Sequence, residues 1–147
     1  MARANGWCDV GVINFFEADA APMQSPREVY PPDTARKVAD EELDGTSIRV
    51  HHAGSERQPQ LLEISVQAGV ELANHSHQID EIIVVTGGEL SLDGRPCPVG
   101  TSAMIPAGTP YAIVAGPEGG RFLNFRPRID FTYAAHGEAA ASAPDPE

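Results

Sequence analysis

Two histidines and a glutamate lie close together in the segment NHSHQIDE, which covers residues 74–81. His75 and His77 are two residues apart, so on one β-strand both imidazoles would point to the same face. The short connection after them lets the chain turn, so that Glu81 would open the next strand. Two imidazoles and one carboxylate suit Fe, Mn, Ni, Zn or Co, and non-haem Fe(II) oxygen chemistry uses three such ligands with open positions. The alternative is a pair of solvated histidines at a strand end, which is common for a bare His-x-His pair.

The spacing around these residues resembles the first of two sequence motifs of the cupin family. That motif reads glycine, five residues, His-x-His, three or four residues, glutamate, six residues, glycine. Gly69, His75, His77, Glu81 and Gly88 match it at every interval. The match favours a metal site over solvated histidines.

The second cupin motif is matched only in part. Gly100, Pro106 and Gly108 are in register, but Tyr111 stands where the motif has a histidine and Ala115 where it has an asparagine. The resemblance covers about residues 46–127. It implies a small barrel of two β-sheets, with one divalent transition metal held inside by the first-motif residues and a fourth residue from the second motif.

Tyr111 is therefore the candidate whose role is most open. It could bind the metal and complete a set of two histidines, a glutamate and a tyrosine. It could instead lie just outside a three-ligand site, as a catalytic hydrogen-bond or acid–base group for the substrate, or it could simply pack in the core.

Further residues are predicted to line the substrate pocket. His52 shares strand parity with Ile48 and Val50, so we expect it to face the interior as a pocket residue rather than a ligand. Among Arg121, Arg126 and Arg128, one could orient an anionic substrate by a bidentate contact. The apolar residues predicted to shape the cavity are Ile83, Val85, Met104 and Ile113.

The elements that must position these residues read as strands. From Thr46 onward, short runs such as Leu62–Val66 alternate apolar and polar residues, and turn residues such as Asp93-Gly94 separate them. Many short antiparallel strands on one core indicate a sandwich or a closed barrel. With the resemblance, we expect an all-β, single-domain, cupin-type double-stranded β-helix, or jelly-roll barrel, with an N-terminal arm.

The chain divides into three expected parts. Residues 1–45 read as an arm with a strand at Val12–Phe16, in which the cluster Tyr30–Asp33 blocks regular structure. Residues 46–133 form the barrel domain. Residues 134–147, rich in Ala, Pro and acidic residues, read as a disordered tail. Because a small barrel cannot easily bury the apolar run of the arm, we expect a homodimer that pairs through the arm.

Composition narrows the classes of partner. The 147 residues carry a formal net charge of −11, which opposes binding to nucleic acid because that binding depends on Lys and Arg. Two cysteines and no evident signal peptide or membrane span favour a cytoplasmic protein without a membrane partner.

The leading functional hypothesis is a metal-dependent enzyme acting on a small-molecule substrate, most simply a dioxygenase-like oxidoreductase with Fe in the barrel, and Mn, Ni, Zn or Co as alternatives. A metal-dependent isomerase, epimerase or lyase without redox chemistry is the second hypothesis. The third is a cupin that binds a small ligand without catalysis.

Overall fold

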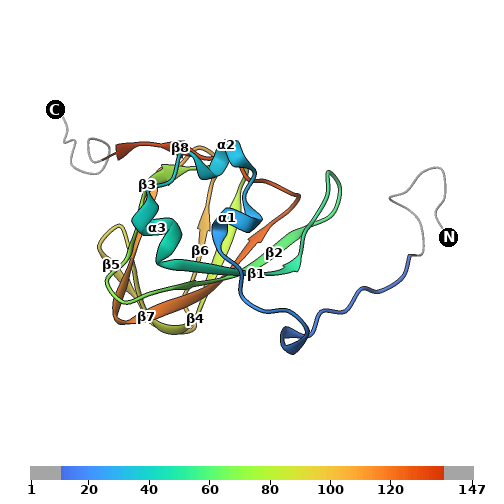
Figure 1. Ribbon diagram of the computed structural model, residues 1–147, viewed down its shortest axis with the longest axis horizontal. Helices are drawn as coiled ribbons and strands as arrows, with labels where there is room; N and C mark the ends of the chain where they lie inside the picture. Colours follow the sequence, from blue (N-terminus) through green and yellow to red (C-terminus); the bar gives the residue numbers. More distant parts are fainter. Residues whose placement is uncertain (1–10, 138–147) are drawn as a thin grey trace.

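The computed structural model describes residues 11–137, so most of the predicted tail lies outside the described residues. Eight strands form the bulk of the molecule, and they pair antiparallel throughout (Figure 1). Their bounds are β1 Thr46–His52, β2 Gln60–Val66, β3 Glu71–Ser76, β4 Glu81–Leu92, β5 Arg95–Cys97, β6 Ser102–Ile105, β7 Tyr111–Arg126 and β8 Ala134–Ala135. The all-β prediction is confirmed.

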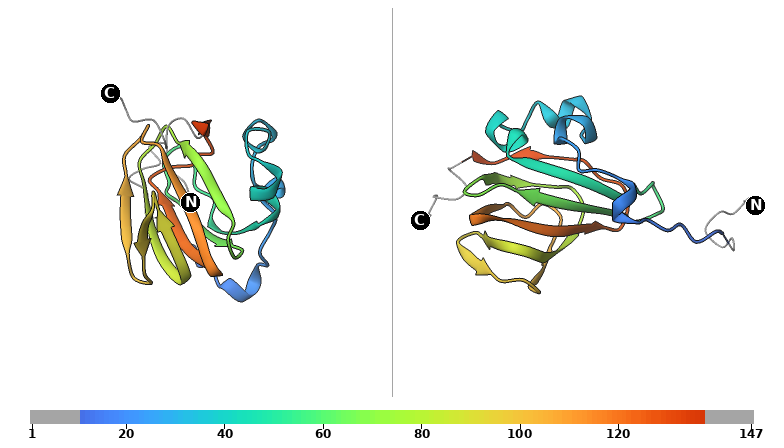
Figure 2. Two further views of the ribbon diagram at one scale, coloured as in Figure 1. Left: turned by 90° about the vertical axis from the view of Figure 1, so that its left-hand side faces the viewer. Right: turned by 60° about the horizontal axis from the view of Figure 1, so that its bottom comes forward.

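Two sheets face each other and share the long strands β4 and β7 (Figure 2). One path runs β1-β2-β7-β3-β8, while β4 pairs with β5, β6 and β7. The register of the β4–β7 pair shifts on both sides of Gly88, where the strands bend. Gly88 has a φ of 64°, and a Cβ there would overlap the carbonyl of Gly119, so only glycine fits this bend.

The period-two pattern of the sequence accounts for the core. In β2, Leu62, Ile64 and Val66 are buried and meet inward-facing residues of β4 and β7, such as Val85 and Phe122. These side chains form one hydrophobic cluster between the sheets. The barrel is therefore filled with apolar side chains over much of its length, and any ligand site must lie toward one end.

The N-terminal arm differs from its prediction. The described residues 11–17 contain no strand, and Val12 and Phe15 are 82% and 86% exposed, because no strand within residues 11–137 pairs with them. Three short helices follow: α1 Pro26–Val29, α2 Pro32–Ala35 and α3 Asp40–Asp44, after a 3₁₀ turn, η1, at Ala18–Ala20.

The proline cluster in the arm starts a helix rather than preventing one. Pro32 is the first residue of α2, a position where a proline loses no hydrogen bond. The three helices lie together along one side of the strands, next to β1 (Figures 1 and 2). The arm therefore covers one face of the barrel domain.

The start of the predicted tail is also ordered. Ala134–Ala135 forms β8 and pairs with His75 and Ser76 of β3, and the backbone N–H of His136 donates to the carbonyl of Asn74 at 3.0 Å. The prediction of disorder is therefore wrong for residues 134–137, because alanine-rich composition carries no information about this tertiary pairing. No helix in the described range is long and apolar enough to cross a membrane.

Candidate active site

A cavity of about 50 Å³ lies between the arm helices and the inner face of β1, β2, β3 and β7. Its wall combines residues of the arm, of the barrel strands and of the segment after β7. They are Pro26, Tyr30, Thr34, Val38, Glu42, Leu43, Thr46, Leu62, Ile64, Leu72, His75, His77, Tyr111, Phe122, Asn124, Arg126, Phe131, Thr132 and Tyr133. Three segments far apart in sequence thus build one site.

His75, His77 and Glu81 lie close together, and the two histidines line this cavity. His75 is near the end of β3, His77 follows the strand directly, and Glu81 is the first residue of β4. The two imidazole centroids are 4.8 Å apart, and Nε2 of His77 is 3.8 Å from a carboxylate oxygen of Glu81. The turn at residues 78–80 reverses the chain between the two strands.

Backbone carbonyls determine the tautomers of both histidines. Nδ1 of His75 lies 2.6 Å from the carbonyl of Ala73, and Nδ1 of His77 bonds the carbonyl of Thr132. A carbonyl can only accept, so both Nδ1 atoms carry the proton and both Nε2 atoms are unprotonated acceptors. Burial, with the neighbouring His77, lowers the pKa of His75 to about 4, and burial with Arg126 lowers the pKa of His77. Both imidazoles are neutral at pH 7.

Glu81 is a buried carboxylate held by three donors. One oxygen accepts from Nδ2 of Asn124 at 2.7 Å and from the guanidinium of Arg126 at 3.2 Å, while the other accepts from the hydroxyl of Tyr111 at 2.7 Å. Burial by itself would raise the pKa of Glu81, but Arg126, His77 and these hydrogen bonds together lower it. Glu81 is therefore ionised.

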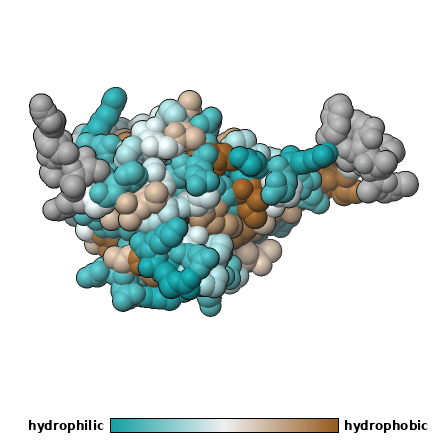
Figure 3. Space-filling model, turned by 90° about the horizontal axis from the view of Figure 1, so that it is seen from above, coloured by the Kyte–Doolittle hydropathy of each residue, from teal (hydrophilic) through white to brown (hydrophobic). Residues whose placement is uncertain are grey.

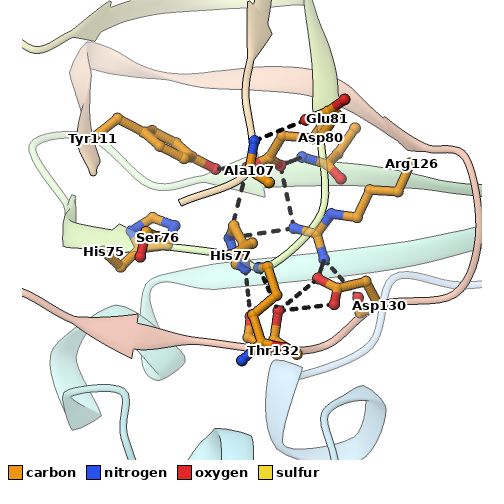
Figure 4. Close-up of polar contacts among 12 residues, drawn as sticks. His75, Ser76, His77, Asp80, Glu81, Ala107, Tyr111, Arg126, Asp130 and Thr132 are labelled. Atoms are coloured by element: carbon orange, nitrogen blue, oxygen red, sulfur yellow. Dashed lines mark hydrogen bonds and ion pairs between the residues drawn. The ribbon is translucent and has the colours of Figure 1, made fainter. Parts of the chain in front are cut away.

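Arg126 is the positive charge at the centre of the site. Figure 4 shows its guanidinium between Glu81, His77 and Asp130. One terminal nitrogen donates to Glu81 and lies 3.4 Å from Nε2 of His77, and the other donates to the backbone carbonyl of Asp130 at 2.6 Å. The Asp130 carboxylate is 3.4 Å from the guanidinium and also accepts from the hydroxyl of Thr132.

As they stand, these residues do not fit a bound metal ion. Both oxygens of Glu81 already accept hydrogen bonds, and the permanent cation of Arg126 touches Glu81 and Nε2 of His77. A metal on those atoms would face a guanidinium at contact distance, where like charges repel strongly. Within residues 11–137, no group of three or more His, Cys, Asp or Glu side chains has the geometry to hold a metal.

Tyr111 is 4% exposed, and its hydroxyl donates to Glu81. Burial and the adjacent Glu81 keep the pKa of Tyr111 well above its usual value, so the phenol is neutral. The hydroxyl has a specific partner, so Tyr111 does more than fill space.

The predicted pocket residues lie elsewhere. Ile83, Val85 and Ile113 belong to the packed core and do not line the cavity. Met104 is 61% exposed, because in β6 the neighbouring Ile105 is the residue that faces inward. His52 also lies outside the cavity wall, since a register shift between Val50 and His52 breaks the strand parity on which its prediction depended.

Several site residues were not predicted from the sequence. Glu42 of α3, Thr46 of β1 and Asn124 of β7 all line the cavity. Asn124 and Arg126 are both on the inner face of β7, so a buried amide and a buried guanidinium two residues apart in a strand were the available signal. Of the three arginines that the sequence offers as a substrate anchor, Arg126 is the one that lines the cavity.

No family model matches the sequence, and no curated protein sequence matches it. Solved structures do match it. The polyketide cyclase RemF from Streptomyces resistomycificus aligns with a TM-score of 0.64 at 21% identity, over 84% of this chain and 85% of RemF. An RmlC-like cupin from Shewanella frigidimarina aligns at 0.58 and 17% identity, over 79% and 92% of the two chains.

A protein from Methylibium petroleiphilum, provisionally named an acetylacetone dioxygenase, aligns with a TM-score of 0.62 at 13% identity, over 92% of this chain and 98% of that protein. Identities this low carry information about the fold and not about the reaction. The similarity extends over most of every chain, and it agrees with the two motifs that surround the site. This protein has the cupin fold.

Proposed function

We propose that the protein is an acid–base enzyme that moves a proton within a small carboxylate or carbonyl compound, without a bound metal. The observation that carries the proposal is the guanidinium of Arg126, which lies beside the neutral Nε2 of His77 at the cavity wall. An oxyanion-binding cation next to a neutral imidazole is the pair that proton abstraction beside a carbonyl requires, once the substrate takes the place of His77 Nε2 on the guanidinium.

Each residue has a distinct part in this chemistry. Arg126 binds the substrate oxygen on which negative charge develops, and its Nε has no hydrogen-bond partner among the described residues. His77 accepts the proton from the adjacent carbon at Nε2 and returns it to a neighbouring atom. The carbonyl of Thr132 steadies the imidazolium that exists in between, and Tyr111 and Asn124 hold Glu81, which positions Arg126.

Access to the site passes His77. A hollow of about 750 Å³ on the outer surface is lined by His77, Thr132, Asp130 and Lys37, and His77 also lines the inner cavity. Lys37 is the only lysine of the chain, and no described residue forms an ion pair with it. In a chain with a net charge of −11, its ammonium favours the entry of an anion at this point.

Proton exchange provides a test that needs no known product. The protein is incubated in D₂O with a panel of 2-oxo and 3-oxo acids, and loss of the C–H signal next to the carbonyl is followed by proton NMR. We expect catalysed exchange that survives chelator treatment, and a loss of about 100-fold or more in His77→Gln. His51→Gln is the control, because His51 of β1 contacts Glu63 of β2 and neither residue lines the cavity.

Metal-dependent oxidation is the second candidate. It is favoured by the unprotonated Nε2 atoms of His75 and His77, since metal-bound histidines often donate Nδ1–H to a backbone carbonyl as these do. It requires Arg126 to leave its contacts with Glu81 and His77. Stoichiometric Fe, Mn, Ni, Zn or Co in untagged protein, together with exchange or oxygen uptake that a chelator abolishes, would replace the first proposal with this one.

A further inference from the structure

We propose that the end of the cavity formed by Glu42 and Thr46 is a second binding subsite, which takes a hydroxyl or a similar uncharged group of the substrate. The inference rests on the proposed function, because it places the carboxylate or carbonyl of the same molecule at Arg126. Glu42 and Thr46 belong to neither cupin motif.

Glu42 is a buried carboxyl group with one oxygen in use. It is 9% exposed, and its Oε1 accepts a hydrogen bond from the backbone N–H of Ala73 at 3.0 Å. No described residue donates to its other oxygen. Thr46, four residues further along, is buried too, and its hydroxyl has no hydrogen-bond partner within residues 11–137.

A second polar atom of the same wall is also unsatisfied. Oδ1 of Asn124 is buried without a partner, while its Nδ2 bonds Glu81. A buried polar group without a partner costs about 1–3 kcal/mol. The unpartnered atoms of Thr46 and Asn124 in one cavity wall indicate a place built for a polar guest.

The geometry of Glu42 and Thr46 suits an uncharged guest. Glu42 has an oxygen without a described donor, and Thr46 has a buried hydroxyl without a partner, so a group that both donates and accepts matches them. Burial also raises the pKa of Glu42 to about 7, with a contribution from the nearby Glu71, so its negative charge is only partly present at neutral pH. A hydroxyl of the substrate meets these requirements.

The polar residues of the cavity wall therefore differ in chemistry. Arg126 and His77 attract an anion, and Glu42 and Thr46 match a neutral polar group. A small hydroxy acid or hydroxylated oxo acid would satisfy both pairs of residues at once.

A series of ligands can measure how much the proposed subsite at Glu42 and Thr46 contributes to binding affinity. Dissociation constants are measured by calorimetry for straight-chain carboxylates of three to six carbons, for the same acids with a terminal hydroxyl, and for the same acids with a terminal amine. We expect one chain length at which the hydroxyl tightens binding about tenfold and the amine does not.

Variants then test whether the tighter binding of the hydroxylated acids depends on the subsite. Thr46→Val and Tyr30→Phe should reduce the hydroxyl advantage to less than about twofold, while the unsubstituted carboxylates bind as before. Ser47→Ala, at the next position of β1 but outside the cavity wall, should keep the full advantage. Circular dichroism checks that each variant remains folded.

Three outcomes would overturn the inference. They are a terminal hydroxyl that adds nothing at any length, as expected if this end holds only water; an advantage that survives both variants; and tighter binding of the amine. None of them touches the proposed function, whose failure would show separately as carboxylates that do not bind at all or bind equally well to Arg126→Lys.

Discussion

Two carboxyl groups at the cavity have opposite environments. Glu81 receives hydrogen bonds from Asn124, Tyr111 and Arg126 and stays ionised, whereas Glu42 has only the Ala73 N–H and a mostly apolar surrounding that disfavours its charge. Arg126 lies beside Glu81, whereas no described cation lies beside Glu42, and this accounts for the difference in their pKa values. Residue type alone would have predicted that both glutamates are ionised at neutral pH.

The raised pKa of Glu42 gives a prediction about stability. The folded-state pKa of about 7 exceeds the ordinary 4.5, so the folded protein binds the proton more tightly and loses stability as the pH rises between these values. The loss reaches about 3 kcal/mol above pH 7. Glu42→Gln keeps an oxygen for the Ala73 N–H and carries no charge, so we expect it to exceed the wild type in stability at pH 8 and to match it near pH 4. Urea unfolding at both pH values measures the difference, and equal curves for the two proteins at pH 8 would contradict the prediction.

Tyr111 gives a second prediction at this scale. Tyr111→Phe removes a buried donor to Glu81, and we expect a loss of about 1–3 kcal/mol in the free energy of unfolding at pH 7. Tyr30→Phe is a matched control, because the Tyr30 hydroxyl has no hydrogen-bond partner within the described chain, so its loss should be smaller. Denaturant unfolding of both variants provides the comparison. If Tyr30→Phe cost as much as Tyr111→Phe, the bond to Glu81 would contribute little.

At the scale of elements, the site depends on two bent strands and one covering arm. β4 carries Glu81 and β7 carries Tyr111, Asn124 and Arg126, and the two strands pair with register shifts around Gly88. Because β4 and β7 bend at this point, each strand belongs to both sheets, and the bend determines where the ends of the two strands lie relative to each other. The helices α1–α3 close the cavity from the other side.

The bend at Gly88 can be tested against a matched glycine. Both Gly88 and Gly94 have positive φ angles, 64° and 83°, but a Cβ at Gly94 meets no atom within 4 Å, whereas one at Gly88 overlaps the backbone of Gly119. We expect Gly94→Ala to cost about 1 kcal/mol from backbone strain alone, and Gly88→Ala to cost about 3 kcal/mol or more. Thermal and denaturant unfolding measure both losses, and similar losses would mean that the β4–β7 bend relaxes easily.

At the scale of the whole molecule, the outer part of the arm is a hydrophobic segment that a single chain leaves exposed to solvent. Val12, Ile13 and Phe15 are 82%, 75% and 86% exposed, and Figure 3 shows hydrophobic colouring along this part of the arm. Consecutive exposed apolar side chains on an extended segment are unusual for a monomer. We therefore propose that this segment packs against a second copy of the chain.

Sedimentation velocity tests this assembly. We expect a dimer for the wild type at micromolar concentration and a monomer when Val12, Ile13 and Phe15 are all changed to Ser, because the apolar contact is lost. Changing Val99 and Met104 to Ser, which are 59% and 61% exposed elsewhere on the surface, should leave the dimer intact. A dimer that persists in the arm variant would place the interface on another surface.

The sequence by itself determined the fold class and brought the ends of two strands together. Alternation of apolar residues along short segments, together with glycines at the bends, indicates an antiparallel sandwich or barrel, and the resemblance to the cupin motifs implies the barrel. The spacing of His75, His77 and Glu81 places them at one turn between β3 and β4. These signals are local. The alternation of apolar and polar residues and the residue types found in turns can both be recognised within a few consecutive positions.

Only the tertiary structure decided what surrounds that turn. Arg126 comes from a strand 45 residues beyond Glu81, and Glu42 comes from a helix 39 residues before it. A local pattern cannot report that a guanidinium reaches two residues expected to bind a metal, or that an arm carries a carboxyl group into the barrel. The charge and the protonation of the site follow from these long-range contacts, because a pKa depends on burial and on neighbours in space rather than in sequence.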